Sequence, residues 1–351
     1  MIEAATGKGN KGMTIREIAR QAGVAASTVS LVLNSKPGVR KEMREKIIRM
    51  LLENGYTIRQ SAPAAAAAGE IRFIRYLSAT HCPERNEDFF AGVLGGTEQY
   101  ASRLGHQLSL SSATPDQLGA LLTSLETQPG LLGVIFLGSE LTEEQIPLLL
   151  DCKLPLVAVD LPAHLEHHPL DSINTDNVGG IFRAMQYLHA RGHREIGFLR
   201  AETELGGLNN RYMSFCNAMQ THGLEINPGY MLRLDPQYDV ATQQMQDFLQ
   251  TGPQLPTAWI AANDIIAAGA IRALQQAGYR VPEDVSIIGF DDGAICTFTV
   301  PPLTTMRINR ARLGELAVDR LLALCQSPDD VVVKSTISVQ LIERDSVLPL
   351  P

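Results

Sequence analysis

Short apolar runs alternate with amphipathic helical stretches along most of this chain, from residue 71 to residue 343. Two of the helical stretches run from Phe89 to Leu104 and from Asp116 to Thr127. Strand–helix alternation of this length predicts parallel sheets with helices packed on both faces. The runs that we expect to be strands are IRFIRYL (71–77), HQLSLSS (106–112), GVIFLG, PLVAVD, IGFLR, TAWIAAN (257–263), DVSIIGF (284–290) and VVVKSTISVQLIE (331–343).

The first 60 residues follow a different pattern, with two short helices predicted in TIREIARQAGVAASTVSLVLN (14–34). Ile15 and Ile18 lie at helical spacing, Gly23 interrupts the pattern, and it resumes at Val29. Two helices joined by a tight turn with Gly are typical of a helix-turn-helix, whose second helix can lie in the DNA major groove. An ordinary helical hairpin in a core is the alternative that spacing alone leaves open.

Charge separates this segment from the rest of the chain. Residues 1–60 carry 11 Lys and Arg against 5 Asp and Glu, whereas the whole chain has a net charge of −8. The segment is therefore +6, and the remaining 291 residues are −14. Because neutralisation of phosphates dominates nucleic-acid affinity, a basic head on an acidic body favours DNA as the partner of the head alone.

A third helix and a linker follow the first two helices. Lys41 to Glu53 has a helical apolar stripe, and Asn54-Gly55 supplies a stop signal. The next stretch, TIRQSAPAAAAAGE (57–70), is low in complexity and contains Pro63, so we expect a linker. The expected domains are a small all-α helix-turn-helix head over residues 1–57, a hinge over 58–70, and an α/β core of doubly wound parallel sheets over 71–351.

Composition excludes several classes of protein. With 351 residues, 45% of them hydrophobic, the chain is long enough for two or three globular domains, and its longest apolar stretches are too short to span a bilayer. The first residues contain no apolar segment of the kind found in secretion signals, so we expect a cytoplasmic protein without membrane contact. Five scattered cysteines form neither a disulfide framework nor a metal-binding spacing.

No motif for chemistry on a ligand is present. The chain contains no GxSxG, P-loop or HExxH sequence, and GKGNKG (7–12), which matches GxGxxG in letters, follows no apolar strand-like run, so we expect neither an enzyme nor a bound cofactor. His164, His167 and His168 in PAHLEHHP lie in a loop bounded by prolines, without partners at ligand spacing along the chain. We therefore interpret this loop as solvated and expect no metal site.

Polar side chains gather at the expected carboxyl ends of the strands, the edge where doubly wound folds bind their ligands. Carboxylates, an amide and an arginine that face one cleft suit a hydroxyl-rich ligand. Taken singly, such residues are more often helix caps or turn residues. The residues concerned are Asp160, Asn263-Asp264 and Asp291-Asp292 after strands, and Asp176-Asn177 and Arg211 near helix starts.

Two longer stretches resemble a known family. The run 14–34 with the following GVRKEMREKIIRMLLENGY resembles the DNA-binding head of the lactose-repressor (LacI/GalR) family. The core of that family, and of the related periplasmic sugar-binding proteins, resembles a second stretch, NDIIAAGAIRALQQAGYRVPEDVSIIGFDD followed by PPLTTMR. The resemblance implies a dimeric or tetrameric transcriptional regulator, by default a repressor, that binds a pseudo-palindromic DNA operator and responds to a small-molecule effector.

By the same resemblance, the effector binds between two lobes, and a sugar or sugar derivative is the first expectation. The lobes are an N-lobe of about residues 71–190 plus 306–334 and a C-lobe of about 191–305 plus 335–351. The positions that match effector-pocket residues of the family are Phe89, Phe90, Asp176, Arg211, Tyr238, Asn263 and Asp291. The alternatives are a nucleobase or a protein co-regulator as effector, a solute-binding protein, and an enzyme, for which the chain lacks a nucleophile, a general base and a cofactor loop.

The resemblance also assigns DNA contacts. Base-reading positions match Ala26, Ser27 and Leu31, phosphate-contacting positions match Thr28, Ser30 and Asn34, and Thr14 is added at the start of the first helix. Leu31 stands where the family usually has Arg, so it can pack against a thymine methyl but cannot form a bidentate contact with guanine. Pro63 lies in the hinge, and an alanine near position 65 replaces the leucine that the family inserts into the minor groove. We therefore do not expect the hinge of this chain to act in every respect as the hinge of the family does.

Overall fold

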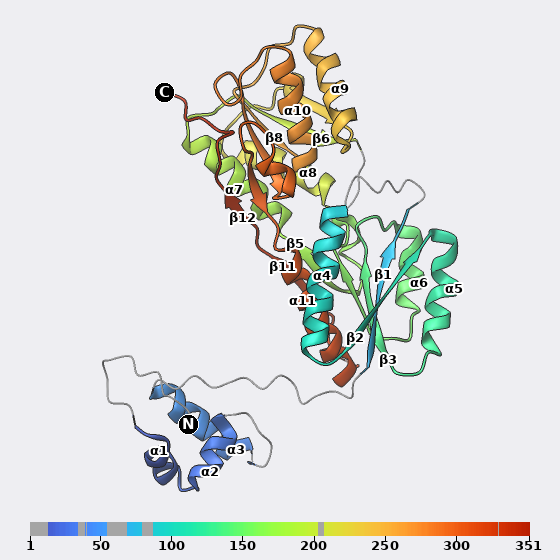
Figure 1. The fold of residues 1–351 in the computed structure, drawn as a ribbon, viewed down its shortest axis with the longest axis vertical. Coiled ribbons are helices and arrows are strands. Elements are labelled where there is room, and N and C mark those ends of the chain that lie inside the picture. The colour runs from blue at the N-terminus through green and yellow to red at the C-terminus, as the bar shows by residue number, and fades with distance from the viewer. Residues whose placement is uncertain are drawn as a thin grey trace. The chain divides into compact units, whose positions relative to one another are not determined.

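A computed structural model describes residues 13–33, 39, 41–54, 69–78, 87–202, 207–328 and 330–351 of the chain (Figure 1). The chain divides into two compact units, Met1–Ala67 and Ala68–Pro351. Asn34 and the expected hinge with Pro63 lie outside the described residues. Among the helices of the described part, none combines the length and the apolar character that a membrane span requires.

The N-terminal unit contains the expected helix-turn-helix. Helix α1 (Ile15–Ala22) and helix α2 (Ala26–Leu33) are joined by a turn at Gly23, whose φ of 76° is a left-handed conformation that favours glycine. The N–H of Gly23 donates to carbonyls in the last turn of α1 and closes that helix. At the other end of α1, Thr14 and Glu17 form a reciprocal capping box.

Helix α3 (Lys41–Glu53) packs against α1 and α2 and completes a small hydrophobic core. Two of the buried positions on α1, Ala19 and Ala22, carry small side chains, which allows the helices to approach closely. The buried residues of this core are Ile18, Ala19, Ala22, Val29, Val32, Ile47 and Leu51. The bounds of α3 agree with the sequence prediction, because its apolar stripe is the part that packs.

The larger unit contains two six-stranded sheets, as expected for two doubly wound lobes (Figure 1). The elements of the N-lobe are β1 (Glu70–Tyr76), α4 (Glu87–Arg103), β2 (Gln107–Ala113), α5 (Pro115–Glu126), β3 (Leu131–Leu137), η2 (Glu143–Gln145), α6 (Ile146–Leu150), β4 (Leu156–Val159), η3 (Ala163–Leu165), β5 (Asp171–Thr175), α11 (Arg310–Gln326) and β11 (Lys334–Ile337). Its strand order is β11-β5-β4-β3-β1-β2, and all neighbouring strands are parallel.

The C-lobe repeats this architecture with one antiparallel edge. Its elements are α7 (Asn177–Ala190), β6 (Ile196–Ala201), α8 (Leu208–Thr221), η4 (Pro228–Tyr230), β7 (Met231–Leu234), α9 (Tyr238–Gln250), β8 (Ala258–Ala261), α10 (Asp264–Gln276), β9 (Ser286–Asp291), η5 (Ala294–Thr297), β10 (Thr304–Arg307) and β12 (Gln340–Ile342). The strand order is β12-β10-β9-β8-β6-β7, and only β12 runs antiparallel to its neighbour β10.

The chain crosses between the lobes at three places, after β5, after β10 and after β11. These crossings differ from the expected boundaries: α7 packs on α8 and on strands of the C-lobe, β10 belongs to the C-lobe sheet, and β11 belongs to the N-lobe sheet. The short strands β5, β7 and β10 lie outside the apolar runs that the sequence analysis took as strands.

The prediction of one strand over residues 331–343 is wrong. Its first part, β11, pairs with β5 in one sheet, and its second part, β12, pairs with β10 in the other. The local pattern of residues does not show this division, because the partner strands lie far away along the chain. The prediction failed because pairing with these distant strands, and not the local sequence, divides the segment.

Helices α4 and α11 of the N-lobe cross at very short range at glycines. A Cβ added at Gly96 would overlap the backbone of Ala311, and a Cβ added at Gly314 would lie 2.5 Å from the carbonyl oxygen of Val93. Backbone atoms within two packed helices cannot move aside easily. The crossing therefore requires glycine, and it fixes the two helix N-termini that carry Glu87 and Arg310 to the space between the lobes.

We expect Gly96→Ala to lower the free energy of unfolding by about 1–3 kcal/mol, the usual cost of overpacking a tight contact. The neighbouring Gly95→Ala is a matched control, because a Cβ at Gly95 meets nothing within 4 Å. That change should leave stability unchanged or raise it by up to about 1 kcal/mol through helix propensity. Denaturant unfolding followed by circular dichroism measures both. Equal stability of the two variants would contradict the close crossing.

Candidate functional site

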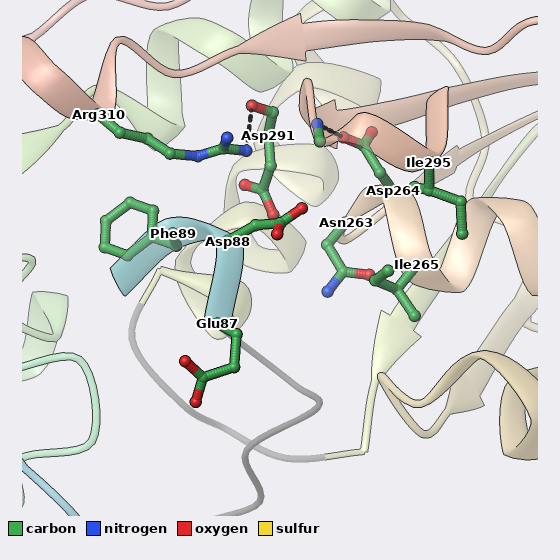
Figure 2. Close-up of a pocket in the computed structure, with 10 residues that line it drawn as sticks. Glu87, Asp88, Phe89, Asn263, Asp264, Ile265, Asp291, Ile295 and Arg310 are labelled. Carbon is green, nitrogen blue, oxygen red and sulfur yellow. Dashed lines mark hydrogen bonds between the residues drawn. The ribbon is translucent and has the colours of Figure 1, made fainter. Parts of the chain in front are cut away.

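A cavity of about 160 Å³ lies between the two lobes (Figure 2). The N-lobe contributes the first turns of α4 and α11, and the C-lobe contributes the start of α10 and the segment that follows β9. With four carboxylates, one amide and one guanidinium, the lining favours polar recognition of a small molecule. The lining residues are Glu87, Asp88, Phe89, Asn263, Asp264, Ile265, Asp291, Gly293, Ile295 and Arg310.

The guanidinium of Arg211 holds one wall of this cavity in place. Its Nε donates to Asn177 Oδ1 at 2.8 Å, and its Nη1 donates to the carbonyl of Ala262 at 2.6 Å. Its Nη2 lies 3.1 Å from Asp291 Oδ1, and its central carbon lies 3.8 Å from the centroid of the Phe290 ring. Only 6% of Arg211 is exposed. Arg211 therefore acts on the cavity through Asp291, which it orients.

Asp160 approaches the same ion pair from the N-lobe. It follows β4 and its Oδ2 accepts a hydrogen bond from the hydroxyl of Ser139 at 2.6 Å. Both Arg211 and Asp291 act electrostatically on Asp160. Within the described residues, the non-glycine positions with positive φ are Asp160, Asp291 and Asp292. Backbone strain of this kind costs on the order of 1–3 kcal/mol per residue and gathers at functional sites.

Burial raises the pKa of three carboxyls at this site, those of Asp160, Asp264 and Asp291. The pKa of Asp264 rises to about 7, because Asp291 adds repulsion to the loss of solvation. Hydrogen bonds from the Thr305 hydroxyl (2.5 Å) and the Gly293 N–H (2.8 Å) oppose this rise only in part. The acidic side chains at the site outnumber its arginines. Carboxylate oxygens therefore remain that can accept hydrogen bonds from a ligand.

Three of the seven expected effector residues, Phe89, Asn263 and Asp291, line the cavity. Phe89 lies on the first turn of α4 and supplies an apolar wall. Asn263 caps α10, because its Oδ1 accepts from the N–H of Ile266 at 2.9 Å. Figure 2 shows the amide nitrogen of Asn263 on the side of α4. A fourth, Arg211, contacts Asp291 from behind the lining.

The other three expected effector residues are not among the residues that line this cavity. The ring of Phe90 makes an edge contact with Phe73 in the N-lobe, with centroids 6.2 Å apart. Asp176 caps α7 by accepting from the N–H of Gly179 at 2.8 Å. Tyr238 is the first residue of α9. The structure therefore brings together only part of the predicted set.

The cavity also includes charged residues that the sequence did not nominate, namely Glu87, Asp88 and Arg310. Asp88 could have been found, because it is adjacent in sequence to Phe89, whereas Asp264 was already among the polar residues expected at the strand ends. Nothing local marks Arg310, which begins a helix of the N-lobe far along the chain. Its Nη2 donates to the carbonyl of Asp291 at 2.8 Å, and its buried Nε has no hydrogen-bond partner among the described residues. A buried donor without a partner is costly and is available to a ligand.

The expected DNA contacts lie on α1 and α2 of the N-terminal unit. The hydroxyl of Thr14 donates to Glu17 Oε2 at 2.8 Å, so in this structure it caps α1. Thr28 and Leu31 are half-buried on α2. The side chains of Ala26, Ser27 and Ser30 and the whole of Asn34 lie outside the described residues. Helix α2 contains no charged residue, so long cationic side chains do not contribute to its surface.

Two parts of the chain match known protein families. Residues 14–58 match the family described as "Bacterial regulatory proteins, lacI family", and residues 185–347 match the "Periplasmic binding protein-like domain". The ribose operon repressor of Haemophilus influenzae is 31% identical over 342 residues, which cover 96% of this chain and 99% of that protein. The HTH-type transcriptional repressor PurR of Pasteurella multocida is 30% identical over 95% of this chain and 98% of that protein.

Solved structures show the same similarity. A complex of the transcriptional regulator CelR with cellobiose has a TM-score of 0.69 and 26% identity, and covers 95% of this chain and 99% of that chain. The Lac repressor dimer bound to operator and the anti-inducer ONPF has a TM-score of 0.67 and 25% identity, and covers 96% of this chain and 100% of that chain. The expected fold, a helix-turn-helix head on a periplasmic-binding-protein-like core, is confirmed.

We expect the Asp264→Asn variant to lose less unfolding free energy than the wild type as the pH rises. Folded Asp264 keeps its proton up to about pH 7, whereas an unfolded aspartic acid releases it near about pH 4. The stability that the protonated carboxyl contributes is therefore full below about pH 4 and is lost as the pH rises towards 7.

Across this window the wild type should lose on the order of 1–4 kcal/mol more unfolding free energy than Asp264→Asn, as measured by denaturant titration at each pH. The exposed Asp345→Asn is the control and should follow the wild type. Parallel curves for Asp264→Asn and the wild type would show that this carboxyl does not titrate in the window.

Proposed function

Because the chain belongs to the LacI family of bacterial regulatory proteins, we propose that it is a transcriptional repressor whose affinity for an operator is changed by a sugar or sugar derivative bound between its lobes. The observation that carries the proposal is the acid-rich cavity, which residues of both lobes line, in a chain that begins with a helix-turn-helix. The two relatives described above are named as repressors, which supports the regulatory part.

The chemistry of the lining supports a neutral, hydroxyl-rich effector. Asp88 and Asp291 offer acceptors from opposite lobes, and Arg310 Nε and the Asn263 amide offer donors. A sugar hydroxyl both donates and accepts, so a small ring with several hydroxyls can satisfy this mixed set. The surplus of carboxylate disfavours a phosphorylated or otherwise anionic ligand. A cavity of about 160 Å³ suits a ligand no larger than a monosaccharide.

The names of relatives agree with this chemistry without deciding it. One relative is a ribose operon repressor, and a solved neighbour is a regulator in complex with cellobiose. Relatives that are 30% and 31% identical are named PurR, and the Phe89 ring at the cavity wall could stack on a planar base. A nucleobase is therefore the second candidate effector.

The proposed mechanism is linkage between the cavity and the head. An effector that bonds residues of both lobes stabilises one relative arrangement of the lobes. DNA affinity then changes only by the difference in effector affinity between the two arrangements. Induction and co-repression both fit this scheme.

The proposed DNA interface is the α2 surface with Thr28 and Leu31, joined by Ala26, Ser27, Ser30, Asn34 and, at the start of α1, Thr14. One short helix reads too few bases for specificity, so we propose a homodimer, or a tetramer of such dimers, on a pseudo-palindromic site. A DNA partner implies action in the cytoplasm.

We expect ribose or glucose, but not the disaccharide cellobiose, to raise the melting temperature, because a ligand at a hundredfold excess over its Kd adds about 2.7 kcal/mol. Ribose 5-phosphate should have no effect. Asp291→Asn should abolish the shift, measured against the melting temperature of the variant itself. The control Tyr279→Phe, outside the cavity lining, should keep it. A shift with hypoxanthine in place of the sugars would move the assignment to a nucleobase effector.

We expect the protein to shift DNA from upstream of its own coding region in a gel assay, with affinity that falls steeply as salt rises. Thr28→Ala should weaken binding about tenfold, because a hydrogen bond to a charged phosphate is lost. The control Thr123→Ala removes an exposed hydroxyl in the other unit and should bind normally. Failure of the wild type to bind this DNA at low salt would refute the repressor assignment.

A further inference from the structure

The loop between β4 and β5 carries two adjacent histidines that the effector site does not use. Their neighbour across the fold is Glu143 of η2, which follows β3. His168 Nε2 lies 2.7 Å from Glu143 Oε1, and the centroids of the His167 and His168 rings lie 3.9 Å apart. One potential ligand atom from each of these three residues lies within 4.8 Å of the other two. Spacing along the chain cannot show this cluster, because Glu143 comes from a different loop.

The orientation of His167 is fixed by a backbone contact. Its Nδ1 lies 2.8 Å from the carbonyl oxygen of His164. A carbonyl oxygen only accepts, so Nδ1 carries the proton and Nε2 of the neutral ring keeps its lone pair. A carbonyl that accepts from the far nitrogen is the usual support of a metal-bound histidine. The turn itself is held by a hydrogen bond from the His168 N–H to the carbonyl of Leu165 at 3.1 Å.

We propose that Glu143, His167 and His168 bind one divalent transition-metal ion of the Zn²⁺ class. Two imidazole nitrogens and one carboxylate oxygen are borderline ligands that suit Zn²⁺, Ni²⁺ or Cu²⁺, whereas Mg²⁺ and Ca²⁺ require oxygen ligands. Ligand atoms around one Zn²⁺ lie roughly 2.0–2.2 Å from the ion. The Glu143 side chain is 61% exposed, so it is free to rotate and close the remaining distance. The ion displaces the proton shared by His168 and Glu143 to solvent, so the cluster supplies three ligands and leaves a position for water.

The ion would join two loops that already meet near the Arg211–Asp291 ion pair. One loop leaves β3 through Ser139 and reaches Glu143, and the other leaves β4 through Asp160 and reaches His167. The Ser139 hydroxyl donates to Asp160 Oδ2 at 2.6 Å, which is the first link between them. A shared ion is a second link, so it restricts the segment that holds Asp160 and stabilises the N-lobe.

Calorimetric titration of the full-length chain with Zn²⁺ tests the site. We expect one ion per chain, and affinity at least about tenfold weaker in His167→Ala and in His168→Ala. Glu143→Gln, which keeps the shape of an exposed side chain, should also weaken binding. His164→Ala is the matched control, because it removes a histidine of the same loop but keeps the carbonyl that orients His167.

The spectrum of bound Cu²⁺ gives a second readout. Electron paramagnetic resonance of a one-to-one complex should show coupling to two imidazole nitrogens, reduced in His167→Ala and in His168→Ala. His189→Ala, which alters another pair of neighbouring histidines, should leave the spectrum unchanged. The proposal is wrong if the wild type binds no Zn²⁺ up to about 0.1 mM, or if binding is equally strong in both histidine variants.

Discussion

The buried guanidinium of Arg211 is the group on which the candidate site depends. A charge with so little exposed surface is costly unless every donor has a partner. The partners come from the end of β9, the turn after β8 and the start of α7, so satisfying one side chain fixes three elements of the C-lobe. The geometry of Asp291, and with it the cavity wall, follows from that requirement.

Across the cavity, one contact attracts the two lobes to each other and another repels them. Arg310 of the N-lobe donates to the backbone carbonyl of Asp291 in the C-lobe, which draws the lobes together. Burial raises the pKa of Asp291, and repulsion from the Asp88 carboxylate of the N-lobe across the cleft adds to that rise. A ligand that donates hydrogen bonds to both carboxylates reduces the repulsion and leaves the attraction. The separation of the lobes is therefore sensitive to a neutral donor-rich ligand, in the way that linkage to DNA binding requires.

Sequence reasoning succeeded where structure is determined by neighbours along the chain. The apolar stripe of residues 41–53 predicted α3, and the polar residues after β4, β8 and β9 do lie at the strand ends. It failed where the structure depends on segments that are distant along the chain. The division of residues 331–343 between two sheets depends on pairing with β5 and β10. Arg310 reaches the cavity only because α11 packs on α4. Asp176 shows a third case, since its carboxylate caps a helix and is not among the residues that line the cavity.

The three crossings between the lobes also affect how such a protein can be recombined. The head is one continuous segment, so a single junction is enough to exchange it for the head of a relative. Neither lobe is continuous, because β11 and α11 return to the N-lobe after most of the C-lobe has been formed. Exchanging one lobe requires three matched junctions at once. Operator preference is thus modular at the level of the gene, whereas effector preference must evolve by substitution within a core that is inherited whole.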